Sequence, residues 1–279
     1  MKKLKLLYVV ALSVLTLTFT SCDEDMLQSL TSGDTVAALK EALKIGAEVA
    51  SNKLGAENGY LNDEQVRIPM PEELQTMIEL ANTDAGQIFL TSMGAEAFVG
   101  KTLDTLINRA AEQAAPEAAG IFADAITSMT VEDGEAILFG ADNAATQYLH
   151  DKTYVDLQST FGQVVTSTFD QVAVSGHSLN DAWSGFTNYY NKVAEYKSTT
   201  IGQLAMATLK VSLNKAGKSA LYEKINSIQQ VNTNLGEYVT GRALDGLFAK
   251  VADKEYEIRT DVSARTSTLL QNVFGRLDK

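Results

Sequence analysis

Charged and amide side chains are the residues of this chain whose types and spacing could support chemistry. Asn108, Arg109 and Glu112 fall within about one turn of an expected helix. Carboxylates in a cleft can act as general acid and base, and arginines bind anionic groups. The candidates for a polar site are Arg67, Asn108, Arg109, Glu112, Asp124, Glu132, Asp133, Arg242, Asp245, Arg259 and Arg265. Two interpretations stay open: a polar pocket between helices, or ion pairs and caps that fix helix register. We favour the second.

Metal and nucleophile motifs are missing from the sequence. His150 and His177 are the only histidines, and neither lies in an H-x-x-x-H or E-x-x-H pattern. No D-x-D-x-D-G calcium loop and no G-x-S-x-G elbow occurs. Residues 94–102, GAEAFVGKT, have one residue too many between the glycines for a phosphate-binding loop. We therefore predict no metal, no cofactor and no catalytic residue of a familiar type.

The first 25 residues have the order of a secretory signal. Lys2, Lys3 and Lys5 precede an apolar run over residues 6–19, and Cys22 follows as the only cysteine. The apolar run is shorter than the ~20 residues that span a bilayer. The segment looks like a bacterial lipoprotein signal, in which the cysteine is acylated and becomes the first mature residue. We expect lipidation at Cys22.

The predicted organisation is a signal peptide over residues 1–21, a lipidated acidic tether over 22–33 and a helical domain over 34–275. We expect an exported protein anchored to a bacterial membrane by its lipid, at the outer membrane, facing the periplasm or the surface. The acidic residues 23–25 resemble an inner-membrane retention signal in some bacteria and a surface-export signal in others, or they form a plain solvated tether.

The charge of the chain limits its partners. Removing residues 1–21 removes three lysines, so 20 basic residues face 35 acidic ones and the net charge is −15. Such a surface repels phosphate backbones, which excludes nucleic acid as an expected partner.

The candidate polar residues lie in a chain whose sequence pattern indicates helices. The chain has only three prolines and no sustained alternation typical of strands. We predict an all-α fold: a single multi-helix domain, an antiparallel or angular stack of roughly 8–10 helices. The expected helices cover about 34–54, 71–81, a segment ending at Pro116, 116–129, 131–139, 142–152, 153–174, 179–196, 235–259 and 261–274. The segment 197–234 is the least patterned.

Several long motifs resemble a known family. They are VRIPMPE (66–72), LINRAAEQAAPEA (106–118), FADAITSMTVEDG (122–134), AATQY (144–148), YVTGRALDGLF (238–248) and IRTDVSARTSTLLQNVFG (258–275). In this order they are similar to DUF4197, a bacterial family of exported helical proteins without an assigned function. The resemblance implies one helical domain in the cell envelope and supplies no catalytic residues. The segment 197–234 is longer than the family pattern, so we expect an extra helical arm there.

Two functions remain. The first is a non-enzymatic lipoprotein that binds another envelope component, either a protein or a small apolar ligand. The second is an enzyme acting on an envelope polymer, with acid–base carboxylates drawn from Asp124, Glu132 and Asp133. A continuous apolar cavity is required by the ligand version. A perturbed carboxylate in a cleft would favour the enzyme.

Overall fold

The computed structural model describes residues 30–93, 100–128, 130–132, 134–174, 176–230 and 234–278. The signal peptide, Cys22, most of the tether, and Asp133 lie outside these residues. The first described helix, α1 (Ser32–Gly55), begins at a capping box in which Thr31 and Asp34 bond each other's backbone N–H groups.

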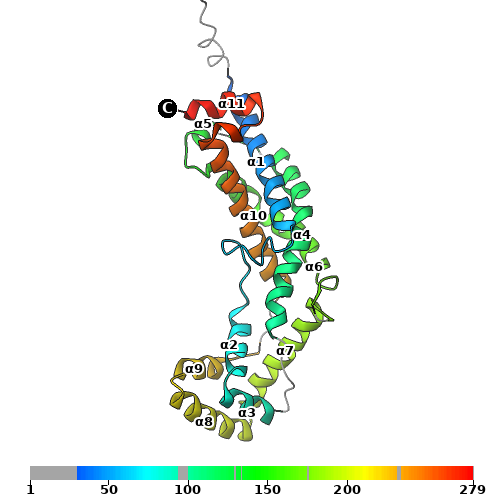
Figure 1. Cartoon of the computed structure of the whole chain (residues 1–279), viewed down its shortest axis with the longest axis vertical. Coiled ribbons are helices and arrows are strands. Elements are labelled where there is room, and N and C mark those ends of the chain that lie inside the picture. The colour runs from blue at the N-terminus through cyan, green and yellow to red at the C-terminus, as the bar shows by residue number, and fades with distance from the viewer. Residues whose placement is uncertain are drawn as a thin grey trace, which may run out of the picture.

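Four long helices form an antiparallel bundle. They are α1, α4 (Gly100–Ser128), α6 (Ala144–Ser167) and α10 (Leu235–Thr260). Each packs against two others in the cyclic order α1, α4, α6, α10, and successive helices run in opposite directions (Figure 1). The core between them is filled by large side chains such as Phe122, Phe161 and Leu43, each at most 1% exposed. The all-α prediction is confirmed. Among the described helices, none combines the length and hydropathy needed to cross a bilayer.

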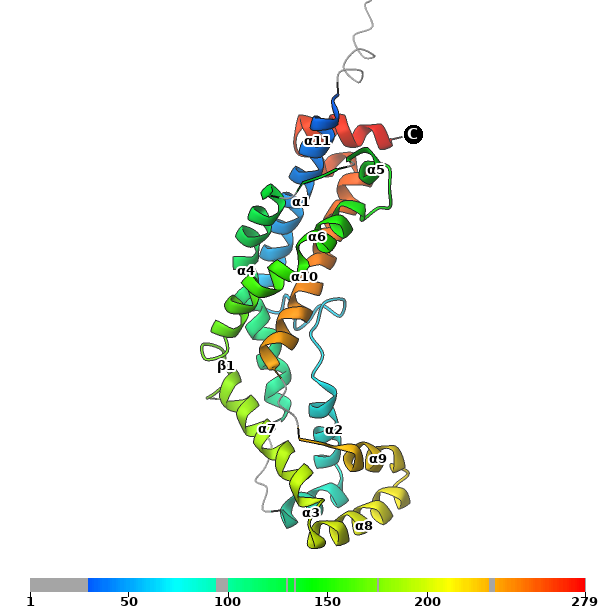
Figure 2. The same ribbon diagram turned by 180° about the vertical axis from the view of Figure 1, so that it is seen from behind.

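Five shorter helices form an arm beyond one end of the bundle. They are α2 (Glu72–Ala81), α3 (Asp84–Ser92), α7 (Leu179–Tyr196), α8 (Thr200–Lys215) and α9 (Ser219–Ser227). Both views show an elongated, curved molecule with this arm at one end and the start of α1 at the other (Figures 1 and 2). The helices α8 and α9 agree with the helical arm expected over 197–234.

The end of the bundle near the start of α1 is closed by short elements. They are α5 (Gly134–Leu138), α11 (Thr268–Phe274) and the 3₁₀ turns η2 (Val262–Ala264) and η3 (Gly275–Leu277). A two-residue antiparallel pair, β1 (Ala173–Val174) and β2 (His177–Ser178), joins α6 to α7.

The predicted break at Pro116 is wrong, because α4 runs through it. An internal proline costs a helix roughly 3 kcal/mol. Ala114, Ala115 and Ala118 around it are fully buried, and the proline ring closely approaches Gly55 of α1. Packing against α1 therefore keeps the helix continuous.

Several other predicted boundaries are also wrong. The expected helices 142–152 and 153–174 form the single helix α6, which ends at Ser167, and the helix expected over 261–274 is α-helical only over Thr268–Phe274. Thr153 starts no new helix, because it lies inside the continuous helix α6, where its hydroxyl donates to the Leu149 carbonyl oxygen at 2.6 Å. The helix expected over 131–139 is shorter and begins at Gly134. The carbonyl oxygen of Thr130, the predicted cap, accepts a hydrogen bond from the Tyr148 hydroxyl at 2.8 Å.

Candidate functional site

The chain between α1 and α2 is fixed to α4 by the side chain of Asn108. This residue is fully buried, and its Oδ1 accepts from the N–H of Ile68 at 2.9 Å. Its Nδ2 donates to the carbonyl oxygens of Ile68 at 3.0 Å and Asp104 at 2.9 Å. Arg67 forms an ion pair with the Asp104 side chain beside it. Both polar atoms of the Asn108 side chain are thus engaged by backbone groups.

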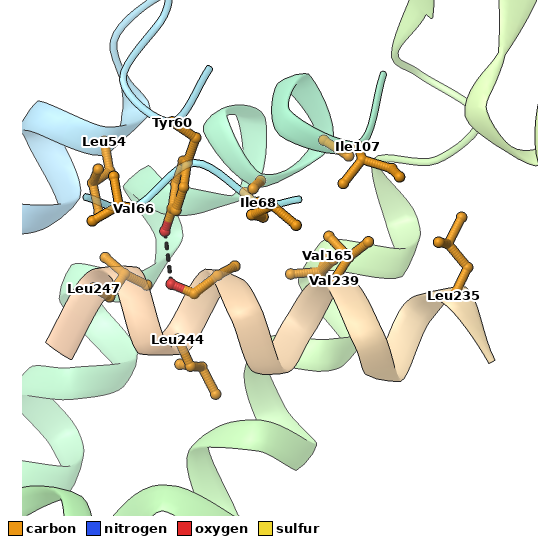
Figure 3. Close-up of a cluster of buried hydrophobic side chains, with 14 of the residues drawn as sticks. Leu54, Tyr60, Val66, Ile68, Ile107, Val165, Leu235, Val239, Leu244 and Leu247 are labelled. Carbon is orange, nitrogen blue, oxygen red and sulfur yellow. Dashed lines mark hydrogen bonds between the residues drawn. The ribbon is translucent and has the colours of Figure 1, made fainter. Parts of the chain in front are cut away.

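Glu112 holds the same connecting chain one turn further along α4. Its side chain is 5% exposed, and Oε1 accepts from the N–H groups of Tyr60 at 3.2 Å and Leu61 at 3.0 Å. Arg109 donates to the other oxygen at 2.5 Å. The Tyr60 hydroxyl donates to the Ala243 carbonyl oxygen of α10 at 2.8 Å, as Figure 3 shows. Burial, and then the charge of Glu112, raises the pKa of Tyr60 well above its usual value.

A buried ion pair links α10 to the start of α6. Glu255 accepts from the N–H groups of Ala145 at 3.0 Å and Thr146 at 2.7 Å, the first turn of α6. Arg259 donates to the same carboxylate and, at 2.7 Å, to the Leu138 carbonyl oxygen that ends α5. Asn143 supplies no side-chain cap to α6, so Glu255 provides the anion that the helix terminus favours.

Arg265 binds the same C-terminal end of α10, beyond Arg259. Its guanidinium donates to the Ile258 carbonyl oxygen at 2.9 Å and the Arg259 carbonyl oxygen at 3.0 Å. It also forms two bonds with Asp278, at 2.6 and 2.7 Å, which lower the pKa of that carboxyl. Arg265 therefore satisfies the last carbonyls of a helix.

Arg242 and Asp245 lie apart from the residues above, on the exposed face of α10. With Tyr238 they border a shallow groove between α6 and α10. The Tyr154 hydroxyl lies 3.4 Å from Asp245 Oδ1, and Tyr238 donates to the Pro69 carbonyl oxygen at 2.7 Å. Burial raises the pKa of both tyrosines.

Asp124 and Glu132 line a groove of about 770 Å³ between α4 and α6. Asp156 and Lys152 of α6 line it as well. Asp124 and Glu132 are exposed, and neither takes part in an ion pair within the described part of the chain. Acid–base catalysis by two carboxylates requires that they lie in different environments, for example one buried and one in water. Asp124 and Glu132 are both exposed in this groove.

The polar contacts that the sequence reading missed join residues distant in sequence. Lys250 is 5% exposed and binds Asp63 at 2.8 Å and Gln65 at 2.5 Å, and the hydrogen bond from Lys250 lowers the pKa of Asp63. Arg276 binds Glu135 through two bonds at 2.6 and 2.8 Å. Of these buried contacts, only the pair of Glu255 with Arg259 could be predicted from the sequence, because the two residues are four apart on one helix.

The described residues contain no cluster of three or more histidine, cysteine or acidic side chains placed to hold a metal ion. The candidate residues thus occupy separate places: the α1–α2 connection, the C-terminal end of α10, its exposed face and the α4–α6 groove.

Comparison with known protein families gives a match over most of the chain. A family model described as "Protein of unknown function (DUF4197)" matches residues 29–207 and 198–275. The two matched segments overlap in the first half of α8 and together cover almost all of the predicted mature chain. No curated protein and no solved structure matches.

Proposed function

The chain belongs to the DUF4197 family, whose function is unknown, and we propose that it is a non-enzymatic interaction protein of the cell envelope, anchored by a lipid on Cys22. Its partner is another envelope component, which it contacts through the surface of its helical domain.

The observation that carries this proposal is the state of the buried polar residues. Asn108, Glu112, Arg259 and Arg265 are engaged by backbone groups or by opposite charges of neighbouring elements. They do not converge on a common cleft. Removing one of them would leave buried partners unsatisfied, which is the signature of a structural role.

The packing of the core bears on the choice between an apolar ligand and a surface partner. The ligand would need an enclosed apolar cavity, whereas the bundle interior is occupied by side chains such as Phe122 and Phe161. The grooves found over the described residues are open and have mixed polar and apolar linings. This arrangement favours a partner at the surface.

The anchor rests on the sequence. A cysteine behind a short apolar run is the place of acylation, and two or more acyl chains give lasting attachment where one does not. The helical domain starts only about ten residues after Cys22, so the end of the bundle that holds the start of α1 lies next to the anchor.

The alternative is an enzyme that cleaves an envelope polymer. It is favoured by one observation: Asp124, Glu132 and Asp156 line the same open groove. In that case Asp124→Asn or Glu132→Gln would abolish turnover of the polymer in cell-envelope digests. Wild-type turnover in both variants would remove the enzyme from consideration.

Native mass spectrometry of the chain gently extracted from its host membrane tests the proposal. A reproducible complex heavier than the acylated chain, retained in Asp124→Asn, is expected for a binding protein. A bare monomer together with groove-dependent polymer cleavage would overturn it.

A separate experiment tests the anchor. Cys22→Ser should lose the mass of the acyl chains and move from the membrane to the soluble or unprocessed fraction. Unchanged membrane attachment with an unmodified Cys22 would refute lipidation, and Ser21→Ala serves as the neighbouring control.

A further inference from the structure

Helix α8 is apolar on two opposite faces. Gly202, Met206, Leu209 and Leu213 are buried against the arm. On the opposite side Ile201, Leu204 and Val211 are 71%, 69% and 55% exposed. These three, with Thr208 and Lys215, follow helical spacing along one side, which we call the outer face of α8. A helix with a second apolar stripe in water presents a surface that other molecules can cover.

The charge around this face is opposite to that of the rest of the chain. Residues 197–230 contain five lysines and one glutamate, a net charge of +4, so the remainder of the chain carries −16. Helix α8 itself has Lys210 and Lys215 and no acidic residue. Lys218 lies just beyond it, whereas Lys224 of α9 is paired with Glu72. The outer face of α8 therefore suits an occupant that is both apolar and anionic.

The position of α8 in the molecule adds a geometric constraint. It lies across the end of the arm that is farthest from the start of α1, in both views (Figures 1 and 2). The start of α1, at Ser32, lies at the opposite end of the molecule. If the N-terminus is anchored in a membrane, α8 lies at the end of the molecule farthest from that anchor. Its outer face is then exposed to whatever lies beyond that end.

We propose that the outer face of α8 docks on an anionic lipid bilayer, as a second membrane contact at the end opposite the N-terminus. Aliphatic side chains enter the interface, and flanking lysines reach the head groups with their long stems. Protein interfaces are enriched in aromatic residues and arginine and depleted in lysine. The outer face of α8 has the reverse composition, so the bilayer fits better than an acidic protein. The inference rests on the proposed function, and it identifies the envelope partner as an anionic lipid bilayer.

Vesicle bridging by the mature chain, residues 22–279, tests this inference. Cys22 is the sole cysteine, so a maleimide lipid couples the N-terminus to neutral phosphatidylcholine vesicles whether or not acylation occurs in cells. Labelled vesicles containing phosphatidylglycerol are added, and their co-flotation with the first population is measured. We expect bridging to anionic vesicles, much less to neutral ones, and its loss at about 1 M salt, where the screening length is ~3 Å.

Matched variants assign the contact to α8. Leu204→Glu/Val211→Glu should reduce bridging about tenfold or more, because charges then meet the head groups. Val155→Glu, at a 76% exposed valine of α6, should leave bridging unchanged. Lys215→Gln/Lys218→Gln should weaken it, whereas Lys44→Gln/Lys53→Gln on α1 should not. Circular dichroism checks that every variant folds.

Three outcomes would overturn the inference. One is absence of bridging at low salt, and another is bridging that survives Leu204→Glu/Val211→Glu. The third is a lipid-free dimer, or a complex with an acidic protein, that depends on Leu204 while vesicles do not bind. The assay supplies the anchor chemically, so its failure leaves acylation of Cys22 standing, and failed acylation leaves the vesicle result standing.

Discussion

The carboxylate of Glu255 lies 2.7 Å from Nη2 of Arg259, with both side chains at most 3% exposed. This pair sits where three helices meet: it belongs to α10, caps the start of α6 and binds the end of α5. A buried pair of this kind is sensitive to loss of one partner, because the other charge then remains desolvated.

We predict that Glu255→Ala lowers the free energy of unfolding by about 3–5 kcal/mol, since it leaves Arg259 buried without its partner and removes the cap of α6. Urea denaturation at neutral pH measures the change. Glu257→Ala is the control on the same helix: its pair with Lys254 is exposed, so the loss should stay within about 1 kcal/mol. Equal effects of the two substitutions would contradict the role assigned to Glu255.

Asn108→Asp should loosen the connection between α1 and α2. The new oxygen would face the carbonyl oxygens of Ile68 and Asp104, to which the amide now donates. We expect a loss of about 1–3 kcal/mol in unfolding free energy and faster amide hydrogen exchange at Ile68. Asn214→Asp on the exposed side of α8 is the control. Unchanged exchange at Ile68 would show that the amide does not hold this segment.

Acid should weaken the contact between α5 and the C-terminal turn. Hydrogen bonds from Arg276, and then from Thr35, hold the pKa of Glu135 below its ordinary value of 4.5. Above that value the carboxylate is charged in both the folded and unfolded states, and its stabilising contribution is complete. As the pH falls, the unfolded chain takes up the proton first, so the contribution declines until the folded carboxyl is protonated as well.

Arg276→Gln should therefore lower stability at neutral pH and flatten the loss below about pH 4.5. Urea midpoints measured from pH 7 downward give both quantities. Arg242→Gln removes the same charge away from Glu135 and should keep the wild-type acid dependence. A wild-type slope in Arg276→Gln would rule out this pair as a source of the pH effect.

Two helical glycines should respond to alanine with opposite signs. A Cβ at Gly246 of α10 would lie 2.8 Å from Tyr60 Cε1 and 3.2 Å from Val66 Cβ. We expect Gly246→Ala to destabilise the protein by about 1–3 kcal/mol through overpacking. Gly120 of α4 faces open space, so Gly120→Ala should stabilise by about 0.5–1 kcal/mol through helix propensity. Thermal denaturation of both variants checks the signs, and destabilisation of both would refute the packing argument.

Local patterns in the sequence were sufficient for much of the helical architecture. The helix expected over 179–196 has those bounds, because Ser178 caps it through the N–H of Asp181 and its apolar stripe is regular. Where packing overrides local preference, the prediction failed. Pro116 looks like a helix break in isolation, yet α1 lies against the alanines around it and holds α4 together.

The polar contacts divide in the same way. The sequence places Asn108, Arg109 and Glu112 on one helix, but nothing local indicates that Glu112 meets Tyr60 or that Lys250 meets Asp63. Those contacts depend on how α4 and α10 lie against the α1–α2 connection. The grouping of Asp124 with Asp156 likewise requires α4 to pack on α6.

The arm consists of two chain segments, both inserted between bundle helices at the same end of the bundle. Residues 72–92 depart after α1, and residues 179–227 depart after α6. Insertions or deletions in α8 and α9 consequently alter the reach of the molecule while the four bundle helices keep their order and directions. The double match of the family model across 198–207 falls in this segment. The length of the arm can thus change without a change in the topology of the bundle.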